Sequence, residues 1–263
     1  MFFAQAICCR VLRLAWVFHN ALVGVVTKKE SAEMDSGNKR PRKRNFNSNS
    51  VARDGLSSNQ FGRRIARQHK LVARTLGRTP PGVAFMGSAR TRPGNPYYDV
   101  NIEAAKAVAA LGFPIYHGGG PGQMEASAIG AAQGGAKSIA LCLRLARKDQ
   151  VFGPYDQAIW FDDFSPRVDT LRRFASVSMV FFPGGIGTMH EAMSMMDNIM
   201  QKKSPVRPII FFEPVPDKPY WQGLFAWLKD VVMAAGLLKA EDIPFVHIVR
   251  SVDELVAVIK AQS

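Results

Sequence analysis

A carboxylate and a glycine-rich turn lie close together in the segment "PGGIGTMHE", which spans residues 183–191. Glycine allows positive φ and lets the backbone approach a ligand closely. The residues after the turn have a helical pattern, and a helix start directs unpaired N–H groups and a positive dipole end at an anion. Gly184, Gly185, Gly187 and Thr188 therefore predict an anion cradle, in which Thr188 either caps the helix or donates its hydroxyl to a phosphate.

Glu191 is the candidate catalytic residue of this segment. It follows Thr188 by three positions, so a capping box is the alternative role. A carboxylate beside a phosphate repels it, unless the carboxylate faces a part of the ligand that becomes positive. The ribose of a nucleotide becomes positive when its glycosidic bond breaks, through an oxocarbenium-like state. The spacing therefore favours glycosidic hydrolysis, with Glu191 stabilising the ribosyl cation and orienting or activating water.

Arg167 is the candidate catalytic partner of this carboxylate. It lies near the start of the helical segment before strand 177–182, and a guanidinium suits phosphate oxygens or ribose hydroxyls. Arg172 and Arg173 lie in the same segment and compete for the role. A plain surface arginine is the remaining alternative.

Two more glycine-rich loops follow strand-like runs, "GSARTRPGNP" at 87–96 and "HGGGPGQME" at 117–125. Parallel strands end at one edge of a sheet, so the three loops are expected to converge on a nucleotide or sugar-phosphate site. No Gly-Lys-Ser/Thr follows the last glycine, so the spacing is not that of a Walker loop. The second loop is not a clean Gly-x-Gly-x-x-Gly, and no acidic residue ends the next strand, which disfavours a dinucleotide redox cofactor. We expect no cofactor and no metal. The candidate substrate-binding residues in these two loops are Gly87, Ser88, Gly119, Gly120 and Met124.

Short apolar runs alternate with helical segments from residue 82 onward. The expected strands cover 82–87, 113–118, 138–143, 158–161, 177–182, 208–212 and 245–249. The expected helices cover 56–78, 97–111, 123–133, 166–175, 188–202, 220–235 and 252–262. Near-continuous apolar strands indicate a sheet that is covered on both faces. The alternation predicts an α/β, Rossmann-like, doubly wound parallel sheet that forms a single domain with a disordered basic N-terminal extension.

The positive charge is concentrated in the N-terminal part of the 263-residue chain. Residues 1–79 hold 16 Lys/Arg and 4 Asp/Glu, whereas residues 80–263 hold 18 and 17. We expect an extension at 1–55 that is apolar and then basic and disordered, a basic helix at 56–79 and a nucleotide-binding domain at 80–263. The run "KRPRKR" at 39–44 is more simply a solvated tail than a nucleic-acid contact.

The first 26 residues are apolar but are interrupted by Arg10, Arg13 and His19. Three interpretations stay open: an amphipathic surface helix, a targeting segment, or sequence upstream of a start at Met34, which we favour. We expect no stable membrane insertion, because the uninterrupted part is too short to span a bilayer. The three cysteines form no disulfide or metal pattern, and we expect a reducing, cytoplasmic location.

The motifs "GSAR", "GGGPGQMEA" and "PGGIGTMHE" closely resemble the LOG ("Lonely Guy") family of phosphoribohydrolases, formerly described as lysine decarboxylases. The resemblance covers about residues 80–250. It implies a Rossmann-like fold, a homodimer with active sites near its interface, and hydrolysis of nucleoside 5′-monophosphates to free base and ribose 5-phosphate. Cytokinin riboside monophosphates and AMP are the implied substrates, and the base preference stays open.

The resemblance carries over at the glycines of residues 184–187, at Thr188 and at Glu191. It points to Arg167 with a shift of one residue, and the lysine that follows the arginine in family members is replaced by Val168 or Asp169. Asp149 is the nearest equivalent of a glutamate that many members carry after the third strand.

These departures motivate a rival interpretation, a nucleotide-binding protein without hydrolytic activity. A third interpretation makes the basic tail a tether for nucleic acid. A lysine decarboxylase is the least expected enzyme, because no lysine occurs in the glycine-rich motifs to form a Schiff base.

Overall fold

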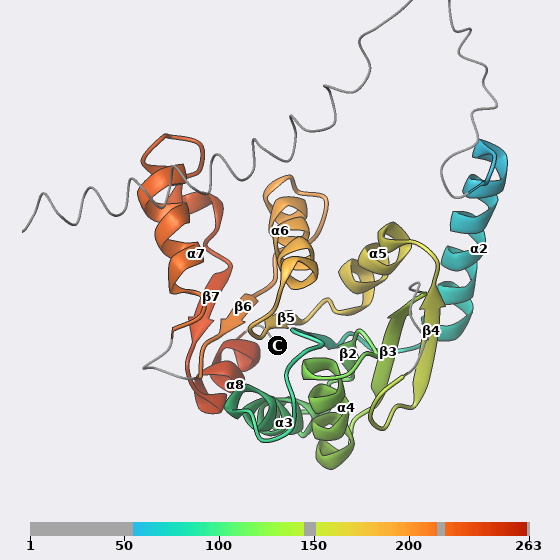
Figure 1. Ribbon diagram of the computed structural model, residues 1–263, viewed down its shortest axis with the longest axis horizontal. Helices are drawn as coiled ribbons and strands as arrows, with labels where there is room; N and C mark the ends of the chain where they lie inside the picture. Colours follow the sequence, from blue (N-terminus) through green and yellow to red (C-terminus); the bar gives the residue numbers. More distant parts are fainter. Residues whose placement is uncertain (1–54, 145–150, 215–218, 262–263) are drawn as a thin grey trace, which may run out of the picture. The chain divides into compact units, whose positions relative to one another are not determined.

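The computed structural model describes residues 55–144, 151–214 and 219–261, which belong to one compact unit (Figure 1). The expected extension at 1–55 lies outside this part except for its last residue, and Asp149 lies outside it as well. Every expected strand is present. The strands are β1 (Val83–Met86), β2 (Ile115–His117), β3 (Ser138–Leu143), β4 (Gln157–Phe161), β5 (Ser178–Phe181), β6 (Ile209–Phe212) and β7 (Val246–Val249).

Every expected helix is present too. The helices are α2 (Ser58–Leu76), α3 (Pro96–Ala109), α4 (Gln123–Gly134), α5 (Phe164–Phe174), α6 (Ile186–Met200), α7 (Gln222–Trp227) and α8 (Val252–Lys260). The segment expected as one helix at 220–235 is divided, because α7 continues as a π-helical stretch, η1 (Leu228–Met233). A 3₁₀ turn, η2 (Ala240–Asp242), precedes β7.

The strands form one parallel sheet in the order β4-β3-β2-β1-β5-β6-β7. The chain builds outward from β1 to β4, returns to place β5 beside β1, and then builds outward the other way. The order therefore reverses between β1 and β5. In open α/β sheets the crevice outside the carboxyl ends of the strands at such a reversal is the usual place for a ligand.

Helices cover both faces of the sheet, as the apolar strands predict (Figure 1). One face packs on α3, α4 and α8, where small residues such as Ala104 and Ala105 allow close approach. The other face packs on α2, α5, α6 and α7, through side chains such as Leu171 and Met195. The doubly wound α/β fold is thereby confirmed. Among the residues that the structure describes, no helix combines the length and apolar character that crossing a bilayer requires.

The basic helix α2 is held at the β4 side of the domain. Its N-terminus is closed by a capping box between Ser57 and Gln60. Gln68 is buried and donates its side-chain amide to Asp162 at 3.1 Å, just after β4. Arg64 pairs with Asp163 at 2.8 Å. These contacts fix one face of α2 against the start of α5.

Candidate functional site

The three glycine-rich loops meet where the strand order reverses. The Ser88 N–H, after β1, donates to the carbonyl of Pro183, after β5, at 3.1 Å. The Gln123 N–H, at the start of α4, donates to the Ser88 carbonyl at 3.0 Å. Ser88 therefore joins the first loop to both of the others. Its hydroxyl accepts the Arg90 N–H at 3.0 Å, which shapes the loop locally.

The start of α6 presents the unpaired donors that an anion site needs. The helix begins at Ile186, two residues earlier than expected, because Gly185 takes the extended N-cap position. Met189 donates the first bond, to the Gly185 carbonyl at 3.0 Å, so the N–H groups of Ile186, Gly187 and Thr188 have no intrahelical partner. Thr188 lies within the first turn of α6 and not at its N-cap, so of its two expected roles the capping one does not apply.

Close packing explains Gly184 of this turn and Gly87 of the first loop. A Cβ at Gly184 would lie 2.1 Å from Thr188 Oγ1, and a Cβ at Gly87 would lie 2.8 Å from Gln123. By contrast, a Cβ at Gly185 or Gly187 would meet nothing within 4 Å. Packing within the protein therefore does not require glycine at residues 185 and 187, and the open space beside them leaves room for a ligand.

Arg167 and Glu191 form a buried ion pair beside the second and third loops. Their side chains are only 5% and 10% exposed. The guanidinium donates Nη1 to Glu191 Oε1 and Nε to the Leu141 carbonyl of β3, the latter at 2.7 Å. The capping-box alternative for Glu191 is wrong, because the N-cap is Gly185 and the carboxylate pairs with Arg167 instead.

The competing arginines of α5 point elsewhere. Arg172 donates to the Lys203 carbonyl at 2.8 Å and to Asp169 at 3.2 Å, and the Arg173 guanidinium lies 5.9 Å from the Phe174 ring centroid. Arg167 is therefore the arginine of this helix that the fold brings to the glycine-rich loops, because its position faces β3 and α6.

The second loop is fixed from both sides of Gly119. Its N–H donates to His117 Nδ1 at 3.1 Å, and its carbonyl accepts the Phe152 N–H at 3.0 Å. Gly119 has φ of +72°, and a Cβ there would lie 2.4 Å from Cys142 Sγ. Only glycine satisfies both the conformation and the space.

His117 is fully buried at the end of β2, and sequence reasoning overlooked it. Because Nδ1 accepts from Gly119, Nε2 carries the proton and donates to Ser138 Oγ at 3.0 Å. Ser138 in turn donates to the Pro154 carbonyl at 3.0 Å. Burial, and secondarily the charge of Arg167, lower the pKa of His117 to about 3. The imidazole is therefore a neutral strut under the loop.

Met124 lies against the glycines of the second loop. A Cβ at Gly118 would meet its Sδ at 2.4 Å, and a Cβ at Gly120 would meet its Cε at 2.6 Å. A Cβ at Gly118 would also lie 2.8 Å from Arg167 Nη2. The second loop thus lies directly over the arginine of the ion pair.

Two further polar residues at the loops were not among the predicted site residues, although Gln123 lies within the GGGPGQMEA motif. Gln123 is buried, and Asn101 donates to its Oε1 at 2.6 Å, whereas its Nε2 has no partner among the described residues. Tyr220 donates its hydroxyl to the Gly184 carbonyl. Only the adjacency of Gln123 to the Gly-Gly-Gly loop could have indicated its place.

Comparisons with known proteins agree with this fold. Three solved structures are similar to the chain over 70% of its length. They are the molybdenum cofactor binding protein of Rippkaea orientalis (19% identity, 98% of that chain, TM-score 0.52), the protein TM1055 (21%, 99%, 0.52) and the molybdenum cofactor carrier protein of Chlamydomonas reinhardtii (20%, 98%, 0.50). At these identities the likeness shows the fold alone. No curated protein matches the chain by sequence.

The family comparison concerns the segment from α4 to α8. Residues 124–259, more than half of the chain, match the model of the family described as "Possible lysine decarboxylase". These residues include the "PGGIGTMHE" segment, and the motifs of the LOG family are those that the sequence carries. The chain therefore belongs to this family, the LOG family.

Proposed function

We propose that this protein hydrolyses the N-glycosidic bond of nucleoside 5′-monophosphates, such as AMP or a cytokinin riboside monophosphate, to free base and ribose 5-phosphate. One observation carries the proposal: the buried Arg167–Glu191 pair adjoins the unpaired amides at the start of α6, at the reversal of the strand order. An anion receptor and a carboxylate occupy one site, as the reaction requires.

The 5′-phosphate is assigned to the start of α6. The N–H groups of Ile186, Gly187 and Thr188 and the positive end of the helix dipole favour an anion. The Gln123 side chain offers a further donor, because its Nε2 has no partner among the described residues. These groups are neutral, and Arg167, whose charge is balanced by Glu191, is the cation beside them.

Glu191 is assigned to the ribose. Arg167 engages Oε1, and no hydrogen bond to Oε2 is made by the described residues. Oε2 would stabilise the oxocarbenium-like ribose and orient the attacking water. The water oxygen forms the bond to C1′, the C1′–N bond breaks with its electron pair leaving on the base, and the water proton ends on the base nitrogen.

We also propose that the protein acts as a homodimer with the site near the interface. Ile186 is 86% exposed at the start of α6, and Phe164 is 51% exposed at the start of α5. Both apolar side chains flank the site, where a second subunit would remove them from water. Light scattering of the purified protein tests this proposal, and a monomer at all concentrations would contradict it.

Nucleotide binding without hydrolysis is the second candidate. Val168 and Asp169 follow the arginine where family members have a lysine, and Asp169 pairs instead with Arg172 at 3.2 Å and His69 at 3.7 Å. The site therefore has one cation fewer than the resemblance implies. Adenine release from AMP separates the two functions.

Decarboxylation through pyridoxal phosphate does not fit the residues present. That chemistry needs a lysine that forms a Schiff base within the site. Every lysine among the described residues is exposed, and none belongs to the three glycine-rich loops. The activity named in the description of the family therefore does not fit the described residues of this site.

The test is to incubate three proteins with AMP and to measure the released adenine by chromatography. The proteins are the wild type, Glu191→Gln and, as a control at an exposed glutamate, Glu241→Gln. We expect release by the wild type and the control, and loss of release by at least about a hundredfold in Glu191→Gln with AMP binding retained. Equal turnover in Glu191→Gln would remove Glu191 from the mechanism. Binding by the wild type without release would support the second candidate.

A further inference from the structure

Four cationic side chains lie in a row on the outer face of α2. Arg63, Arg67, Lys70 and Arg74 are all exposed. They recur at intervals of four, three and four residues, so they share one face of the helix. The opposite face carries the buried Gln68, Val72 and Leu76. We call the four cationic residues the α2 stripe.

The α2 stripe lacks carboxylate partners within the described residues. Its one hydrogen bond there runs from Arg63 Nε to the Asn59 carbonyl at 3.3 Å. By contrast, the neighbouring Arg64 pairs with Asp163 at 2.8 Å. No Asp or Glu occurs anywhere in residues 55–79. Like charges three or four positions apart destabilise a helix, so the arrangement is one that a polyanion would stabilise.

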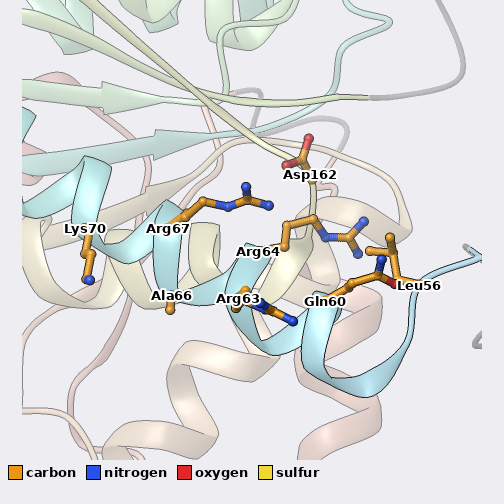
Figure 2. A pocket seen from close by; sticks show the side chains of 8 residues that line it. All are labelled: Leu56, Gln60, Arg63, Arg64, Ala66, Arg67, Lys70 and Asp162. Carbon is orange, nitrogen blue, oxygen red and sulfur yellow. The ribbon is translucent and has the colours of Figure 1, made fainter. Parts of the chain in front are cut away.

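A hollow of about 730 Å³ lies beside this part of α2. Arg63, Arg67 and Lys70 are among the residues that line it, and Figure 2 shows them on successive turns of the helix. Asp162, the acidic residue of its lining, is already engaged by Arg144 at 3.2 Å and by Gln68 at 3.1 Å. The free charge around the hollow is therefore positive.

We propose that the α2 stripe binds the phosphate backbone of double-stranded nucleic acid without reading its sequence. The stripe runs from residue 63 to residue 74, a rise of about 16 Å along the helix axis. Duplex DNA carries about one negative charge per 1.7 Å, so several phosphates face such a length. Three of the four cations are arginines, whose planar guanidinium matches phosphate oxygens in a bidentate way.

The composition of the stripe favours a duplex over a membrane or a single strand. Helices that lie on membranes carry large apolar side chains on the face they bury. The exposed large apolar residues of α2, Phe61 and Leu71, lie outside the stripe, and its buried apolar residues Val72 and Leu76 pack on the domain. Single-strand binders stack bases on aromatic rings, and no aromatic residue belongs to the stripe.

The test measures binding of a fluorescent 20-base-pair DNA duplex by anisotropy, with the full chain, at several salt concentrations. The variant changes Arg63, Arg67, Lys70 and Arg74 to Gln. The matched control changes four exposed lysines elsewhere, Lys106, Lys229, Lys239 and Lys260, to Gln, so that both variants lose the same charge.

We expect the stripe variant to bind the duplex at least about tenfold more weakly at low salt, and its log–log salt slope to fall by about 0.9 for each phosphate that it no longer neutralises. The control should bind nearly as the wild type does, and both variants should release adenine from AMP at the rate of the wild type. Equally weakened binding in the two variants would show a net-charge effect and overturn the proposal.

Two further arms distinguish other polyanion sites. A tail variant, in which the basic residues of 39–44 are changed to Gln, tests the N-terminal tail. If the tail variant lost all duplex binding while the stripe variant lost no binding, the proposal would be overturned. Sedimentation with phosphatidylserine vesicles tests a membrane. Vesicle binding that depends on the stripe, without duplex binding, would overturn the proposal as well.

Discussion

Arg167 connects two elements that flank the central strands: its Nε donates to the Leu141 carbonyl of β3 at 2.7 Å, and its Nη1 pairs with Glu191 of α6. The backbone bond fixes the plane of the guanidinium, and the ion pair then fixes the carboxylate. A carboxylate held in this way needs little reorganisation when positive charge develops nearby. The pair is thus prepared for the reaction proposed above.

The first prediction compares two buried arginines. Arg207 is also buried, but it donates to the carbonyls of Arg172 and Ala175, each at 2.8 Å, at the end of α5. We expect Arg207→Met to lower the free energy of unfolding by about 1–3 kcal/mol with turnover of the folded protein unchanged. We expect Arg167→Met to lower kcat by at least about a hundredfold.

Urea unfolding and adenine release measure these two effects. Because Arg167→Met leaves Glu191 buried and unpaired, that variant also loses stability. Its turnover is therefore measured below its unfolding midpoint. Full turnover by folded Arg167→Met would exclude a role for Arg167 in the reaction.

The second prediction concerns the glycines above Arg167. Cβ atoms at Gly118 and at Gly120 would both meet the flexible Met124 side chain, but only the one at Gly118 would also lie 2.8 Å from Arg167 Nη2. We expect Gly118→Ala to displace the guanidinium and lower kcat by about tenfold or more, since small misplacements cost large factors in rate. Gly120→Ala should lose less, and steady-state kinetics with AMP compares the two. A larger loss in Gly120→Ala would contradict this geometry.

The third prediction separates packing from ligand contact in the third loop. A Cβ at Gly184 would lie 2.1 Å from Thr188 Oγ1, so Gly184→Ala should cost about 1–3 kcal/mol of stability. Gly187→Ala adds a methyl group in open space within a helix, where alanine is favoured by up to about 1 kcal/mol. We expect Gly187→Ala to leave the protein at least as stable but to raise the KM for AMP.

Thermal unfolding and KM are the readouts for this pair. An unchanged KM in stable Gly187→Ala would mean that the phosphate does not lie beside the start of α6. A loss of stability in Gly187→Ala equal to that in Gly184→Ala would contradict the packing argument.

The sequence predicts the fold well because each strand of the sheet can be recognised from a short stretch of consecutive residues. Each strand is a short apolar run, and each of the three loops follows one, so position in the chain implies position at the sheet edge. The start of α6 differs by two residues because the extended backbone of Gly185 decides it, and composition does not encode that conformation. The π-helical stretch within 220–235 could not be predicted for a similar reason. Its backbone hydrogen bonds span one residue more than those of an α-helix, but the pattern of apolar residues in the sequence stays the same.

The site was harder to predict than the fold. Arg167, Arg172 and Arg173 look equivalent in the sequence, and only tertiary burial directs the first of them to Glu191. His117 and Gln123 were overlooked because their roles depend on contacts with Ser138 and Asn101, which lie far away in the chain. The functional roles of all the site residues stay predictions until adenine release is measured.

The last prediction follows from the buried imidazole of His117. Its pKa falls to about 3 in the folded protein, chiefly through burial, from an ordinary value of 6.5. Between these values the unfolded chain binds a proton that the folded protein does not, so stability rises with pH. The contribution of His117 is therefore complete above pH 6.5 and is lost as the pH falls from 6.5 toward 3, with a slope of up to about 1.4 kcal/mol per pH unit.

Urea unfolding of the wild type and His117→Gln at pH 7, 6, 5 and 4 checks this prediction, because carboxylates contribute equally to both proteins and cancel in the difference. We expect the stability advantage of the wild type to shrink steadily below pH 6.5. His247→Gln is the matched control. His247 is only half-buried, and burial lowers its pKa in the same direction as that of His117. The difference in free energy of unfolding between the wild type and His247→Gln should change less with pH than the difference between the wild type and His117→Gln. If the difference between the wild type and His117→Gln stayed constant, His117 would titrate normally in the folded protein. The claim that a neutral His117 supports the Gly119 loop would then be wrong.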